Sequence, residues 1–72
     1  NWEEAIAQTE RAIQIEPLSE ALYRLLMTTL QQSGRIHAAQ DAYIRCCKAL
    51  RQSGNGLPSH ETVQIYNALH SS

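Results

Sequence analysis

The sequence has little of what turn-rich, disulfide-bonded or membrane-spanning proteins need. Its 72 residues include 3 glycines, 2 prolines, 2 cysteines and no phenylalanine. The glycines and prolines are too few, and too widely separated, for a fold rich in β-turns. No apolar run approaches the about 20 residues that a membrane-spanning helix needs, and no signal peptide is recognisable. These absences favour long, uninterrupted elements outside the membrane.

The two cysteines, Cys46 and Cys47, are neighbours in the sequence. Neighbouring residues of a helix point about 100° apart, so these two thiols cannot easily bridge each other. Without a disulfide framework, the reducing cytoplasm is the expected location. Zinc spacing such as C-x2-C is absent, and His37 falls on a different expected element from His60 and His70, which lie near the two ends of theirs. We therefore expect no metal site and no cofactor.

Residue patterns for catalysis or phosphate binding are also missing. Cys46 has the position of a small core residue, and no base to activate it can be named. The segment Gly54-Asn55-Gly56 lacks the glycine-lysine pattern and the preceding strand of a phosphate loop. Because no acid–base constellation can be named, we expect no catalytic residue and no enzyme activity.

Neither sign of charge dominates, since the formal net charge is -1. A domain that binds nucleic acid by itself usually carries a basic excess, so no direct binding is expected beyond a weak, salt-dependent contact at Arg45, Lys48 and Arg51. The charge is unevenly spread, however, with acidic residues in excess over 1–20 and basic residues in excess over 21–52. Solvated helix faces explain most such patterns, and an electrostatic contact between modules or with a partner is the alternative.

The sequence does contain clear helical periodicity, with apolar residues recurring at three- and four-residue spacing. We expect helices at about residues 2–15, 19–33, 36–52 and 59–70. Ser19 and Ser59 are suitable N-caps, while Pro17 and Gly34 would end the first two helices. No window alternates with a period of two, so no strand is expected. The predicted fold class is all-α, with about four antiparallel helices in a single domain over residues 1–72.

The 19–33 segment is apolar around more of its circumference than a surface helix. Its apolar residues are Leu22, Tyr23, Leu25, Leu26, Met27 and Leu30. At about 100° per residue they cover about 200° of the helical wheel, which is wider than one apolar stripe. We therefore expect this helix at the centre of the fold, with neighbours on two sides and Leu26 in the core.

The spacing of small residues indicates an internal repeat. Ala5 and Ala39 are 34 positions apart, and so are Ala12 and Cys46. This spacing is the period of a tetratricopeptide repeat (TPR), whose second helix carries the pattern that Ala39-x3-Tyr43 matches. The sequence thus predicts a TPR-like, right-handed array, in which residues 2–17 are the second helix of an earlier unit. We expect the chain to be a piece of a larger protein.

Three stretches resemble a known family, the bacterial transcriptional activator domain. They are EPLSEALYRLLM at 16–27, SGRIHAAQDAY at 33–43 and GLPSHETVQIY at 56–66. The last is similar to that family's closing motif, P-S-x-E-T-x-x-L-Y, with Ile65 in place of leucine. The resemblance implies a TPR-like bundle that usually follows a winged-helix DNA-binding domain in antibiotic-regulatory-protein (SARP-type) regulators. The chain would be the C-terminal half of such a domain.

What the resemblance implies about function is contact with other proteins. The expected partners are a second copy of the chain, as a homodimer, an adjoining DNA-binding domain, or the transcription machinery. Two alternatives stay open: a generic TPR-like adaptor, and a regulatory or docking appendage of an enzyme. Residues preceding Asn1 would distinguish the three.

Two sets of residues are candidates for partner contacts. In TPR-like packing the first helix of each pair lines the concave side, which would place Arg24, Thr28 and Gln31 at a groove. An ordinary solvated helix face is the alternative for this set. Trp2 and Ile6 form the second set, because a missing preceding helix would leave their apolar side chains open to a partner.

Overall fold

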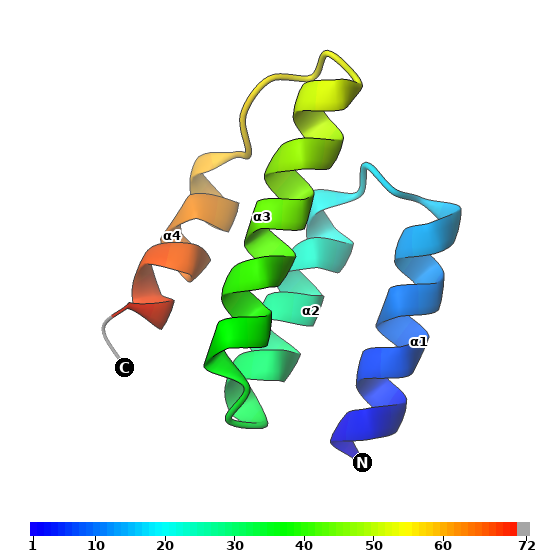
Figure 1. Cartoon of the computed structure of the whole chain (residues 1–72), viewed down its shortest axis with the longest axis vertical. Coiled ribbons are helices and arrows are strands. Elements are labelled where there is room, and N and C mark those ends of the chain that lie inside the picture. Colours follow the sequence, from blue (N-terminus) through cyan, green and yellow to red (C-terminus); the bar gives the residue numbers. More distant parts are fainter. Residues whose placement is uncertain (71–72) are drawn as a thin grey trace.

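The computed structural model describes residues 1–70 as four α-helices in a single antiparallel array (Figure 1). The helices are α1 (Trp2–Ile15), α2 (Glu20–Gln32), α3 (Ile36–Gln52) and α4 (His60–Leu69). No strand occurs among these described residues. The expected all-α, TPR-like architecture is therefore confirmed. Residues 71 and 72, which the expected domain 1–72 includes, lie outside the described part of the chain.

Helix α2 is the central element, because it packs against α1, α3 and α4. Its Leu26 and Met27 are fully buried, as the width of its apolar surface predicted. The whole buried apolar set is Ile13, Tyr23, Leu26, Met27, Leu30, Ala39, Ala42, Cys46, Leu50 and Leu69. The small side chains of α3 allow its backbone to approach α2 closely, so the core is compact around α2.

One member of the expected apolar set differs from the prediction. The side chain of Leu25 is 50% exposed. On a helical wheel Leu25 lies about 100° from Leu26, on the same edge as the exposed Ala21 and Gln32. The neighbouring helices thus cover a narrower arc of α2 than its apolar residues occupy.

Local hydrogen bonds fix the connection between α1 and α2. The Ser19 hydroxyl accepts a hydrogen bond from the Leu22 N–H at 3.4 Å, which caps the beginning of α2. The Tyr23 hydroxyl donates to the Pro17 carbonyl at 3.1 Å. At its other end α2 stops at a turn in which Gly34 has φ +83°, a left-handed conformation that glycine adopts without strain.

Ion pairs connect α1 with α3. Both terminal nitrogens of Arg45 donate to the Glu10 carboxylate, at 2.9 and 2.7 Å, and Arg35 pairs with Glu3. The acidic excess of residues 1–20 and the basic excess of residues 21–52 therefore meet partly within the chain. These pairs are accessible to water, so each contributes only about 0–1 kcal/mol to stability.

Candidate protein-interaction surface

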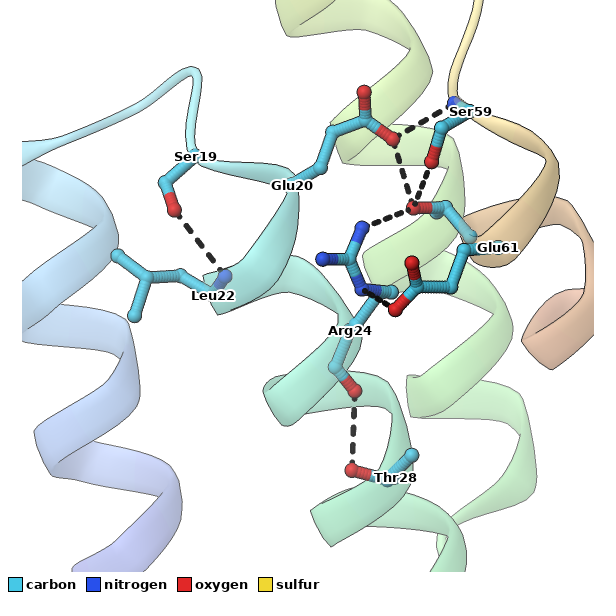
Figure 2. A network of polar contacts seen from close by, with 8 residues as sticks. Ser19, Glu20, Leu22, Arg24, Thr28, Ser59 and Glu61 are labelled. Atoms are coloured by element: carbon cyan, nitrogen blue, oxygen red, sulfur yellow. Dashed lines mark hydrogen bonds and ion pairs between the residues drawn. The ribbon is translucent and has the colours of Figure 1, made fainter.

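The first predicted set, Arg24, Thr28 and Gln31, lies along one side of α2. Arg24 turns toward α4, where its Nη1 donates to Oγ1 of Thr62 at 3.0 Å and its Nε lies 3.4 Å from a carboxylate oxygen of Glu61 (Figure 2). The Arg24 side chain is 22% exposed. The Arg24 guanidinium thus joins α2 to α4. These contacts fix the side chain and leave only a minor part of its surface accessible to a partner.

The other two residues of this set are half-buried. The Thr28 hydroxyl donates to the backbone carbonyl of Arg24 at 3.1 Å within its own helix (Figure 2). The Leu25 carbonyl also lies 3.1 Å from this hydroxyl. Gln31 lies one turn further along α2. The half-exposed Leu25, which sequence reasoning counted in the apolar set of this helix, is an additional candidate.

The second predicted set lies on a different part of the molecule. Trp2, in the first turn of α1, is 48% exposed. Ile6 is partly buried and packs against the core, one turn further along the helix. Because α1 and α4 lie at opposite edges of the array (Figure 1), these residues and the α4-facing Arg24 do not form one continuous site.

A polar cluster between α2 and α4 is the main feature that sequence reasoning missed. We name it the α2–α4 cluster; it consists of Glu20, Arg24, Ser59, Glu61 and Thr62. Figure 2 labels the first four of these residues. Oε1 of Glu20 accepts hydrogen bonds from the Ser59 N–H at 2.8 Å and from the Thr62 hydroxyl at 2.7 Å. Thr62 is fully buried, yet its hydroxyl has partners on both sides.

The electrostatics of this cluster favour a charged Glu20. Partial burial acts to raise the pKa of the Glu20 carboxyl. Hydrogen bonds from Ser59 and Thr62, together with the positive charge of Arg24, outweigh that effect and hold the pKa below its ordinary value. Sequence reasoning assigned Ser59 only to capping. The one sequence feature that could have indicated this cluster is the closing motif, which contains Ser59, Glu61 and Thr62.

An aromatic contact joins α3 and α4 beside this cluster. The rings of Tyr43 and Tyr66 stack with centroids 4.0 Å apart, and His70 meets the Tyr66 ring edge-on at 4.6 Å. Burial, with a hydrogen bond to Cys47, raises the pKa of Tyr43 to about 12. Both tyrosines pack against the core, so they contribute to the stability of the fold.

Comparison with known proteins decides the family. A protein-family model described as the bacterial transcriptional activator domain matches residues 1–70. The chain belongs to this family. No curated protein and no solved structure matches the chain. The bacterial transcriptional activator domain is a regulatory domain, which agrees with the resemblance read from the sequence.

The structure shows what the closing motif of the bacterial transcriptional activator domain contacts. Ser59 and Thr62 bind Glu20, Glu61 pairs with Arg24, and Tyr66 stacks on α3. Each of these motif residues contacts another helix. The motif therefore attaches α4 to the remainder of this activator domain.

Over residues 1–70, no pocket is formed and no group of three His, Cys, Asp or Glu side chains could hold a metal ion. None of the described helices has both the length and the apolar character required to cross a bilayer. What the activator domain offers to partners, over these residues, is exposed helix faces and loops.

Proposed function

We propose that this domain is a protein–protein interaction and oligomerisation module of a bacterial transcriptional regulator. DNA binding is carried by a separate domain outside this chain, and no catalytic step is assigned to the chain. The observation that carries the proposal is the match of residues 1–70 to a family of regulatory domains. The net charge of -1 supports it, because a domain that binds DNA alone usually has a basic excess.

The proposed partners are a second copy of the chain, an adjoining DNA-binding domain or the transcription machinery, in the cytoplasm. Trp2 is the strongest candidate contact because tryptophan dominates binding energy at many interfaces and 48% of this residue is exposed. Ile6 extends the same apolar surface. Thr28 and Gln31 form the second contact, and Arg24 contributes to it through the part that Glu61 and Thr62 leave open.

Analytical ultracentrifugation over a wide concentration range tests the homodimer. We expect reversible association that Trp2→Ala weakens by about tenfold or more, as loss of a central aromatic contact should. Leu57→Ala is the matched control, since Leu57 is also apolar and is 81% exposed on a loop. A chain that stays monomeric at every concentration, or one that both substitutions weaken equally, would contradict the assignment to Trp2.

A second measurement addresses the division of labour with a DNA-binding domain. Fluorescence anisotropy of a labelled DNA duplex should show no saturable binding by this chain at physiological salt. Tight, sequence-selective binding by the chain alone would contradict the proposal that DNA recognition resides elsewhere.

A further inference from the structure

Helix α4 differs from α1 and α2 in how its first turn is held. Asn1 and Ser19 accept hydrogen bonds from the first amides of α1 and α2 through their side chains. Ser59, the N-cap of α4, makes no such bond. Instead its own N–H donates to Glu20 of α2. The residue that precedes α4 is thus held by a carboxylate from another helix.

The length and composition of α4 make this dependence important. The helix has ten residues, and isolated helices shorter than about 12–15 residues are marginal in water. Three of its residues, Thr62, Val63 and Ile65, are β-branched, which lowers helix propensity further. On its own sequence α4 is therefore a weak helix, and packing against α2 and α3 must supply its order.

The geometry of the α2–α4 cluster links helix formation to docking. Ser59 and Thr62 are three residues apart, and one helical turn brings them to the same side. Both then donate to the same oxygen, Oε1 of Glu20. An extended chain could not present both donors to one atom. Glu20 thus recognises the first turn of α4 only when that turn is helical.

The connection to α3 leaves α4 separate from the remaining helices. Residues 53–57 are all exposed, and Gly54 and Gly56 both have φ +80°. Further contacts of α4 include the Tyr43–Tyr66 stack, the burial of Leu69 and the packing of Ile65 against the core. The packing of α1 on α2 and of α2 on α3 does not involve α4.

We propose that α4 is a conditionally folded helix, which docks on and leaves α2 and α3 as one unit under the control of Glu20. In the released state, α1–α3 stay folded. The Tyr43 ring and the surface that buries Leu69 then become accessible. This device is independent of the interaction role proposed above, and it resides entirely in the described residues.

Hydrogen exchange on the 72-residue chain tests this device. In Glu20→Ala, amides of α4 should exchange about ten- to hundredfold faster, the range expected when hydrogen bonds to a charged group are lost. Amides of α1 and α3 should keep their rates. Glu16→Ala is the matched control, since it removes the same charge from an exposed residue whose side chain has no hydrogen bond or ion pair in the described structure. Equal acceleration in all helices, or none in α4, would overturn the proposal.

Two further measurements keep the test decisive. Thr62→Val retains the shape of the buried side chain but removes its hydroxyl, and it should also accelerate exchange in α4 alone. If Glu20→Ala does not fold, native-state exchange of the unmodified chain at low denaturant answers the same question. The α4 amides should then exchange through an opening of smaller denaturant dependence than those of α1–α3. Exchange of α4 only through global unfolding would refute the device.

Discussion

The substitution Leu26→Ala is the most direct test of the packing around α2. Leu26 is 0% exposed and lies in the core that α2 forms with its neighbours. Each buried methylene-sized group contributes about 0.8 kcal/mol, and the cavity left behind adds to the loss. For a core leucine the total cost is about 2–5 kcal/mol.

The size of the chain makes this loss a large share of its stability. At roughly 0.05–0.15 kcal/mol per residue, a chain of 72 residues has about 4–11 kcal/mol in all. Urea unfolding followed by far-UV circular dichroism measures the change. We expect Leu26→Ala to lower the transition midpoint strongly, or to leave the chain partly unfolded in the absence of denaturant.

The adjacent residue supplies a matched control. Leu25→Ala removes the same atoms from a side chain that is 50% exposed, so its cost should be about 1 kcal/mol or less. The two substitutions differ in burial and hardly in helix propensity. Equal losses for both, or a loss below about 1 kcal/mol for Leu26→Ala, would show that the assignment of the two faces of α2 is wrong.

Three further predictions follow from individual residues. The hydrogen bonds from Arg45, reinforced by the positive charge of Arg45 and opposed in part by burial, lower the pKa of Glu10 below its ordinary value. The stability that this pair contributes is therefore present above the unfolded-state pKa of Glu10 and is lost as the pH falls through the folded-state pKa. Urea midpoints measured against pH should show a smaller loss of stability in acid for Arg45→Gln. Gly34→Ala should destabilise the chain by about 1 kcal/mol in the same assay, because φ is +83° there although the space is open. Burial raises the pKa of the Cys46 thiol to about 11, so a thiol reagent should modify the half-buried Cys47 first. Mass spectrometry of the digested chain measures the modification of each cysteine. Equally fast reaction of Cys46 would contradict this prediction.

The sequence was sufficient to predict the helices and the central place of α2, because both depend on local periodicity. The burial of Leu26 followed from the same pattern. The exposure of Leu25 did not, since the wheel shows which residues are apolar but not how much of the circumference the neighbours cover. That difference is set by the angles at which α1, α3 and α4 pack.

The contacts of Arg24 and Glu20 were beyond sequence reasoning for a related reason. Arg24 was interpreted from its own helix alone, as a groove residue. The partners of Arg24 and Glu20 lie about forty positions away, at Glu61, Thr62 and Ser59. Spacing within one helix carries no information on such a pairing, and only the closing motif marked the residues on the other side.

The ion pairs of the arginines have a consequence for any polyanion that approaches the molecule. Arg24, Arg35 and Arg45 each face a glutamate, so most of the positive charge that the middle of the chain carries is neutralised locally. Lys48 and Arg51 remain on α3 as the cations to which no carboxylate is paired in the described structure. A phosphate backbone would therefore experience a much weaker attraction than a count of basic residues suggests. Such a surface would not compete for DNA with the separate DNA-binding domain proposed above.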